Sequence, residues 1–313
     1  MSRPARLLLQ KTYTVGMGRS QGSSGEERST MYAHTATETD IPFRTYDGGT
    51  LTATLYRPAA PAIAAVVEVH GGAWTSGNRT MNAAIARHLS ANGIAVLALD
   101  FRMPPDAAYP VTVTDVTAGI RWMRTHSTDV GTTPRRVGLL GTSSGGHLAL
   151  LAALRPADER YAGPVLGGEP DTAVDFAVLG WPVSDPPARY RMVRERADTR
   201  LMEAHDAFWV DEAQMTEGSP YDIVSRGDAQ RLPSLLILQG TSDDNLTPDM
   251  QQRFVAAYRA RGGRVELATF EGQPHAFISR DPDSDAAHEA LVRITAFIIR
   301  EATAGGKDGR AGR

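Results

Sequence analysis

The sequence predicts an α/β protein with a mainly parallel β-sheet that is covered by helices on both faces. Short apolar runs alternate with helical patterns along most of the 313 residues, which is the order expected of parallel strands joined by crossing helices. Several of these runs are apolar at nearly every position, as in strands that are buried on both faces. The length and the 42% hydrophobic content are sufficient for a large buried core.

The expected elements follow in a regular order from residue 51. Residues 51–58 alternate like a half-buried strand, and the apolar run 63–70 indicates a fully buried one. After these two, helices are expected over 81–93, 111–126, 147–155, 249–263 and about 285–302, and strands over 94–100, 136–141, 175–181, 234–240 and 264–270. A long insert without a strand pattern, from about 184 to 231, interrupts the alternation.

The two ends of the chain differ from this alternating part. Residues 1–40 include a glycine- and serine-rich stretch with few apolar residues, so they are predicted to form a flexible arm. Residues 304–313 have the same character and are predicted to be disordered. One domain is therefore expected over residues 41–303.

The composition argues against several classes of function. A formal net charge of −3 gives no reason to expect nucleic acid or an anionic membrane as a partner, and no apolar run has the length of a membrane span. The absence of cysteine excludes disulfides and thiolate metal sites, and the sequence contains no phosphate-binding loop. We therefore expect a cytoplasmic protein without cofactor or metal, and a homodimer is left open.

The stretch GTSSGG, residues 141–146, carries the first candidate catalytic residue. Gly141, Ser143 and Gly145 match the pattern G-x-S-x-G, in which a serine stands on a sharp turn between a strand and a helix. The glycines permit the close backbone approach that such a turn requires. Taken alone, the pattern also fits a glycine-rich turn whose serine caps the helix. As a nucleophile, Ser143 needs a base and an acid that orients the base.

Both partners are available at the carboxyl ends of later strands. His275 follows the expected strand 264–270, and Asp243 and Asp244 follow the expected strand 234–240. The order serine, aspartate, histidine is that of the α/β-hydrolase triad. Asp243 stands three residues after the glycine that ends its strand, which is where hydrolases with this order of residues place their acid, so the resemblance to them implies that Asp243 is the acid. Asp249 is expected in the first turn of the next helix instead.

The stretch HGGAW, residues 70–74, is predicted to supply backbone donors for an oxyanion. Gly71, Gly72 and Ala73 follow a buried strand, where small residues let the chain come close enough to a tetrahedral intermediate. The complementary donor is the N–H of Ser144, the residue after the nucleophile. No role is predicted for the hydroxyl of Ser144.

Together, the motifs HGGAW, DFRMPPDAAYP, GTSSGGHLAL, LQGTSDD and GQPHAF resemble the α/β-hydrolase superfamily, on its carboxylesterase and hormone-sensitive-lipase-like side. The resemblance covers roughly residues 41–303. HGGAW is similar to the HGGxW of feruloyl-esterase-like hydrolases and of kynurenine formamidase. The resemblance implies that Asp100 and Arg102 form a structural pair that braces the oxyanion loop. It also implies that the helical insert of about 184–231 is a lid.

Three aromatic residues and one acid are further candidates. Trp74, Phe208 and Trp209 are predicted to bind substrate, with helical core as the alternative for the pair in the insert. Glu68 lies within an apolar strand, where an unpaired carboxylate would be costly. It is expected either to pair with an arginine or histidine, or to be an acid of raised pKa near the oxyanion loop.

The predicted function is that of a serine hydrolase that cleaves carboxylic esters of small or medium acyl or aryl groups through an acyl-enzyme. The first alternative is an aryl formamidase of the same fold, since amide and ester hydrolysis pass through the same kind of intermediate. The second is a binding protein of the hydrolase fold without catalytic activity.

Overall fold

The computed structural model describes residues 10–14, 35–128, 130, 137–162 and 172–304. These residues form a nine-stranded sheet with the order β1-β2-β3-β5-β4-β6-β7-β8-β9. The strands are β1 (Gln10–Thr14), β2 (Thr35–Tyr46), β3 (Gly49–Arg57), β4 (Ala64–Val69), β5 (Ile94–Leu99), β6 (Val137–Thr142), β7 (Phe176–Gly180), β8 (Ser234–Gly240) and β9 (Val265–Phe270).

The sheet has an antiparallel part and a parallel part. The first three strands pair antiparallel, and β3 joins β5 in the same way. From β5 onward all neighbours are parallel, in the order β5, β4, β6, β7, β8 and β9. The carboxyl ends of these six strands therefore meet at one edge of the sheet, where ligands bind in folds of this kind.

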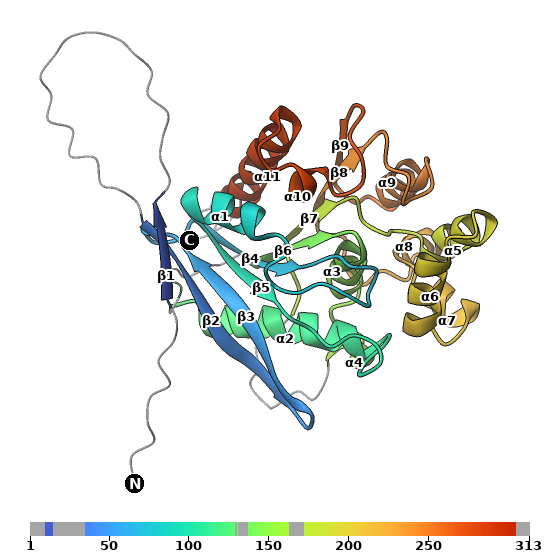
Figure 1. Cartoon of the computed structure of the whole chain (residues 1–313), viewed down its shortest axis with the longest axis horizontal. Coiled ribbons are helices and arrows are strands. Elements are labelled where there is room, and N and C mark those ends of the chain that lie inside the picture. Colours follow the sequence, from blue (N-terminus) through green and yellow to red (C-terminus); the bar gives the residue numbers. More distant parts are fainter. Residues whose placement is uncertain (1–9, 15–34, 129, 131–136, 163–171, 305–313) are drawn as a thin grey trace, which may run out of the picture.

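Helices cover both faces of the sheet (Figure 1). They are α1 (Ala83–Ala91), α2 (Val111–Thr125), α3 (Ser144–Leu154), α4 (Glu159–Ala162), α5 (Pro186–Glu195), α6 (Thr199–Phe208), α7 (Glu212–Glu217), α8 (Pro220–Arg226), α9 (Met250–Ala260), α10 (Phe277–Arg280) and α11 (Asp285–Ala304). The helices α1 and α11 pack together on one face, while α2 and α3 cover the other. The insert helices α5 to α8 gather beside α3 and α9.

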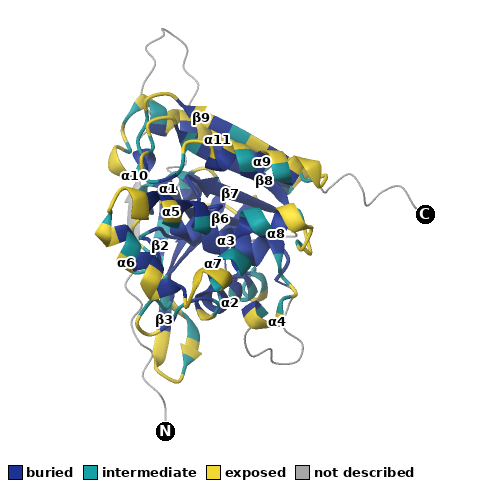
Figure 2. Cartoon of the chain, turned by 90° about the vertical axis from the view of Figure 1, so that its right-hand side faces the viewer, coloured by how far each residue is buried: buried dark blue, intermediate teal, exposed yellow. Residues whose placement is uncertain are grey.

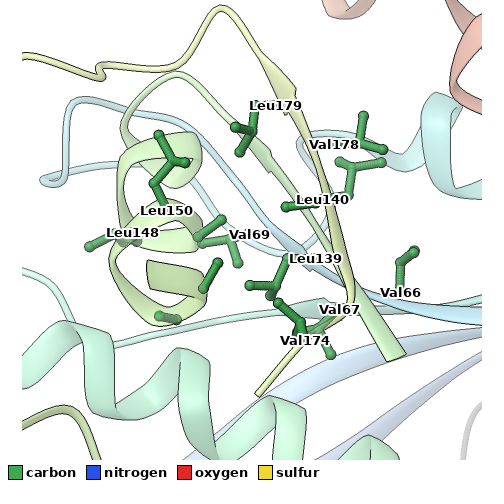
Figure 3. Packing of buried hydrophobic residues seen from close by; sticks show 14 of the residues in the cluster. Val66, Val67, Val69, Leu139, Leu140, Leu148, Leu150, Val174, Val178 and Leu179 are labelled. Carbon is green, nitrogen blue, oxygen red and sulfur yellow. The ribbon is translucent and has the colours of Figure 1, made fainter. Parts of the chain in front are cut away.

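The core lies between the parallel strands and these helices, as the burial colours of Figure 2 show. Strands β4, β5, β6 and β7 are buried at every position, which explains their continuous apolar sequences. Every residue of α3 is buried as well. Figure 3 shows Leu148 and Leu150 of this helix in the same buried cluster as Leu139 of β6 and Val69 of β4. The helix that follows Ser143 is thus fixed inside the core.

The predicted boundaries need correction at both ends. The segment predicted as a flexible arm contains β1 and the first six residues of β2, so that prediction is wrong for residues 10–14 and 35–40. Pairing with β3 orders residues 37–46, because it satisfies their backbone groups. At the other end, Ala304 is still helical. The remainder of both predicted tails lies outside the described residues.

Among the helices that the structure describes, none combines the length and the apolar character needed to cross a membrane. The cytoplasmic location and the homodimer stay predictions from the sequence.

Candidate active site

The turn between β6 and α3 presents Ser143 in a strained conformation. Its φ is 53° and its ψ is −120°, which non-glycine residues rarely adopt and which is typical of functional sites. The two flanking glycines are needed for space. A Cβ on Gly145 would lie 2.1 Å from the carbonyl oxygen of Val69, and one on Gly141 would lie 2.5 Å from the carbonyl oxygen of Gly145. The backbone on both sides of Ser143 is therefore packed so closely that only glycine fits at these two positions.

A continuous hydrogen-bonded series joins the three residues predicted from the sequence. His275 Nε2 lies 2.9 Å from Ser143 Oγ, and His275 Nδ1 lies 2.8 Å from Asp243 Oδ2. His275 follows β9 and Asp243 follows β8, so adjacent strand ends bring them together. All three side chains are largely buried.

Asp243 is held as a carboxylate by its surroundings. Burial raises its pKa, but the hydrogen bond and charge of His275, together with bonds from Gln239 Nε2 and the Asn245 N–H, outweigh this and lower the pKa below its usual value. The other two aspartates of this region, Asp244 and Asp249, take no part in the hydrogen-bonded series. Asp244 is exposed, and the carboxylate of Asp249 pairs with Arg253 at 2.9 Å.

The glycine loop after β4 lies directly against Ser143. A Cβ on Gly71 would be 3.2 Å from Ser143 Cβ. Three successive residues, Gly72, Ala73 and Trp74, have positive φ angles of 116°, 54° and 65°. Among the described residues, the N–H groups of Gly72, Ala73 and Ser144 form no hydrogen bond with an acceptor of the chain. These donors are therefore available to a bound group.

A cavity of about 210 Å³ opens beside Ser143. The glycine loop and His275 form part of its wall, and the insert contributes Arg189, Arg200 and Leu201. Further polar residues of the lining that the sequence did not predict are Asn82, Thr142, Asn245, Ser279 and Arg280. No local pattern distinguishes these arginines from the many others in the chain.

This fold has counterparts among known proteins. The family model of the α/β hydrolase fold matches residues 66–279. The chain belongs to the α/β-hydrolase family. Esterase LipC of Mycobacterium tuberculosis is 31% identical over 234 residues, which cover 70% of this chain and 54% of LipC. Ethyl acetate hydrolase of Pseudomonas putida is 27% identical over 291 residues, 86% of either chain. The chain thus spans about half of the length of LipC.

Two solved structures share the hydrolase fold. Est2 of Thermogutta terrifontis, solved with propionate bound, superposes with a TM-score of 0.67 at 24% identity and covers 84% of this chain and 94% of its own. Carboxyl esterase 2 of Tuber melanosporum superposes with a TM-score of 0.71 at 22% identity, with coverage of 87% and 89%. At these identities the likeness concerns the fold.

The hydroxyl of Ser144, for which the sequence predicted no role, forms a hydrogen bond with the glycine loop. Its Oγ accepts a hydrogen bond of 3.1 Å from the backbone N–H of Trp74, in a buried position. The bond ties the glycine loop to the helix that follows Ser143. The two adjacent serines of the elbow thus face different partners.

The expected substrate role of Trp74, Phe208 and Trp209 is not supported by their positions. All three are buried and none lines the cavity beside Ser143. Trp74 and Phe208 stack with their ring centroids 5.1 Å apart, and Trp209 meets both edge-on. They form a packed aromatic cluster beneath the glycine loop, so the core interpretation holds for the pair in the insert.

His147 joins this aromatic cluster to the insert through two hydrogen bonds. Its Nδ1 accepts from Trp74 Nε1 at 3.1 Å, and its Nε2 donates to the carbonyl oxygen of Gly218 at 2.9 Å. Burial lowers the pKa of His147 to about 4, so the neutral ring with one acceptor and one donor nitrogen fits both partners. His147 is thus a buried hydrogen-bonding residue.

Glu68 is linked to the cavity through one residue. Burial raises its pKa to about 8, while a hydrogen bond from Asn82 Nδ2 acts in the opposite direction. Asn82 lines the cavity and also bonds to Thr142 Oγ1 and Ser279 Oγ. The partner of Glu68 is therefore an amide and not an arginine or histidine, and its raised pKa agrees with the second of the two alternatives expected for it.

The expected pair of Asp100 and Arg102 does not form. Asp100 accepts from Arg79 Nη1 at 2.6 Å, while Arg102 binds Asp115 at 2.9 Å. Each of the two side chains thus binds an oppositely charged residue other than its expected partner. Asp100 still braces the region after the glycine loop, through Arg79.

Proposed function

We propose that this α/β-hydrolase cleaves carboxylic esters of small or medium acyl or aryl groups through an acyl-enzyme on Ser143. The hydrogen-bonded series Asp243–His275–Ser143, which ends at a cavity, carries the proposal. The names of the relatives, an esterase and an ethyl acetate hydrolase, agree with an ester as substrate. A binding protein of this fold would not need the complete series.

In the first step, His275 Nε2 accepts the proton of Ser143 Oγ as the oxygen attacks the ester carbonyl carbon. The imidazole becomes positively charged, with its Nδ1–H directed at Asp243. Because the pKa of Asp243 is lowered, this group stays a carboxylate, fixes the ring and stabilises the imidazolium.

The negative charge that develops on the carbonyl oxygen needs donors that are already in place. The N–H groups of Gly72, Ala73 and Ser144 fulfil this role in the proposal, since none forms a hydrogen bond with an acceptor among the described residues. The Trp74 N–H is not included, because it is engaged by the Ser144 hydroxyl. His275 then gives its proton to the leaving alcohol.

The second half of the reaction releases the acid. His275 takes a proton from a water molecule, which attacks the acyl carbon bound to Ser143 Oγ, and the same donors stabilise the second tetrahedral intermediate. Collapse returns the proton to Ser143 Oγ. The cavity of about 210 Å³ is in keeping with acyl groups of small or medium size.

The decisive experiment compares Ser143→Ala with the wild-type protein on 4-nitrophenyl acetate, 4-nitrophenyl butyrate and N-formylkynurenine. We expect the variant to lose ester hydrolysis by up to about a millionfold and to lose labelling by a fluorophosphonate. Ser225→Ala, an exposed serine on α8, is the control and keeps both. Efficient hydrolysis of N-formylkynurenine with poor hydrolysis of both esters would replace the proposal by the formamidase alternative.

A further inference from the structure

The cavity beside Ser143 has an excess of positive charge. Arg189, Arg200 and Arg280 all line it, and no aspartate or glutamate is among its described lining residues. Arg200 and Arg280 are exposed, whereas Arg189 is 1% exposed. Ester hydrolysis at Ser143 does not itself require any of these three cations.

Arg189 carries a buried charge that no carboxylate of the described residues neutralises by an ion pair. Its Nε and Nη2 donate to the backbone oxygen and to Oδ1 of Asn245, at 3.2 and 2.6 Å. Its Nη1 has no hydrogen-bond partner in the described part of the chain. Burial lowers the pKa of Arg189 to about 10, which leaves the guanidinium positively charged at neutral pH.

The acidic groups near Arg189 have other partners. The carboxylate of Asp243 binds His275, Gln239 and the Asn245 N–H. The carboxylate of Asp198 caps α6 by accepting from the Leu201 N–H at 3.0 Å. Both acids favour the charged form of Arg189 and Arg200 opposes it. A buried cation without a direct counter-ion is costly, and an anionic ligand in the adjoining cavity would offset that cost.

We propose that this hydrolase selects esters that carry a carboxylate on their acyl or alcohol part, with Arg189 as the buried positive charge and Arg200 and Arg280 at the cavity mouth. The inference rests on the proposed ester hydrolysis and adds the class of substrate to it. Guanidinium groups suit this task, since they stay charged and match the geometry of a carboxylate.

If Arg189 had a purely structural role, its replacement would affect charged and neutral esters differently from what the proposal predicts. Arg189 holds Asn245, whose N–H binds Asp243 Oδ1, so the side chain also braces the loop of the catalytic acid. Loss of that bracing lowers the hydrolysis of charged and neutral esters by the same factor. Only a charge-selective role changes the ratio of kcat/KM between a charged ester and a neutral ester of matched length.

The test measures that ratio in a pH-stat for two pairs of substrates. Monoethyl glutarate against ethyl pentanoate places the charge on the acyl part, and 4-acetoxybutanoate against butyl acetate places it on the alcohol part. Arg189→Met keeps the stem and removes the charge, whereas Arg189→Lys keeps the charge. The double variant Arg200→Gln/Arg280→Gln changes exposed residues only and covers the case in which Arg189→Met does not fold. The control is Arg194→Gln, because Arg194 lies on the same helix as Arg189 but is exposed and pairs with Glu212.

We expect the wild-type protein to prefer the charged ester of at least one pair by about tenfold or more at low salt. Arg189→Met lowers that ratio by about tenfold, Arg189→Lys by less than about threefold, and Arg194→Gln leaves it unchanged. The double variant lowers the ratio and weakens its dependence on ionic strength, because exposed charges are screened by salt.

An equal loss for both members of each pair, or a wild-type preference for the neutral esters, overturns the inference while the proposed function stands. Absence of hydrolysis for all four esters and for 4-nitrophenyl butyrate overturns the proposed function and the inference with it.

Discussion

Replacing Ser144 by alanine tests whether the side chain after the nucleophile positions the glycine loop. The substitution keeps the backbone N–H that the proposed mechanism uses and removes only the hydroxyl. That hydroxyl accepts the hydrogen bond of 3.1 Å from the Trp74 N–H. Because both residues are 1% exposed, no water replaces the lost acceptor without a rearrangement of the loop.

The expected decrease in kcat follows from the Trp74 N–H, which is left without an acceptor in Ser144→Ala. A buried N–H without an acceptor costs about 1–3 kcal/mol. If the loop shifts to satisfy it, the N–H groups of Gly72 and Ala73 move away from the developing oxyanion. When the whole penalty falls on the transition state, kcat decreases by about 5- to 150-fold. We therefore expect kcat of Ser144→Ala to fall by roughly tenfold to a hundredfold, with a KM within about threefold of the wild-type value.

The assay is the hydrolysis of 4-nitrophenyl butyrate, combined with thermal unfolding of each variant. Ser90→Ala is the matched control, because Ser90 is also buried and its hydroxyl has no partner among the described residues. Ser144→Cys retains a weak acceptor and should fall between Ser144→Ala and the wild-type protein. A kcat of Ser144→Ala within about threefold of the wild-type value would refute a positioning role for the hydroxyl.

Three further predictions concern other parts of the site. Asp243→Asn should lower kcat by about 10³- to 10⁴-fold and Asp244→Asn by less than about tenfold. If Asp244→Asn lost more kcat than Asp243→Asn at the same pH, Asp244 would be the acid that orients His275. The pKa of about 8 for Glu68 in the folded protein means that ionisation of this buried group destabilises the wild-type protein as the pH rises from 5 to 8. The free energy of unfolding of Glu68→Gln, measured in denaturant, should therefore increase relative to that of the wild-type protein over this window, by up to about 4 kcal/mol. A difference between the two proteins that does not change with pH would contradict this. Phe208→Ala should cost about 3–5 kcal/mol of unfolding free energy, and an unchanged melting temperature would exclude a core role.

The hydrogen-bonded series of Ser143, His275 and Asp243 could be predicted because its geometry follows from strand order. Ser143, Asp243 and His275 each stand just after a buried strand, and the carboxyl ends of parallel strands meet at one edge. Apolar runs mark such strands in the sequence, so a residue that follows one is placed in space without further knowledge. The same reasoning located the glycine loop after β4.

The aromatic cluster could not be predicted in this way. Phe208 and Trp209 stand at the end of α6, in a polar insert whose helices could pack in many ways. Their contact with Trp74 joins segments that are far apart in the sequence, and no periodicity encodes it. Likewise, the pair of Asp100 and Arg102 was implied by the resemblance alone, and the partners that the two residues have instead, Arg79 and Asp115, lie 21 and 13 residues away in the sequence.

The contacts of Trp74 explain how three successive residues can hold positive φ angles beside the nucleophile. Such backbone is kept only where the surrounding structure determines it. Here the Trp74 N–H is bound by Ser144 of α3, its indole N–H by His147, and its ring by Phe208 from the insert. The glycine loop is thus fixed to the helix of the nucleophile and to the insert at the same time.

In the structure the insert forms one wall of the cavity and packs on the glycine loop, and its role as a lid stays a prediction from the sequence. Moving it away would expose Trp74 and Phe208, which are buried against each other, and would release the backbone that presents the oxyanion donors. The same insert places Arg189 over the Trp74 ring, 5.6 Å from its centroid. Substitutions under the insert should therefore change turnover and substrate choice together, since one packed unit supports both the donors and the cation.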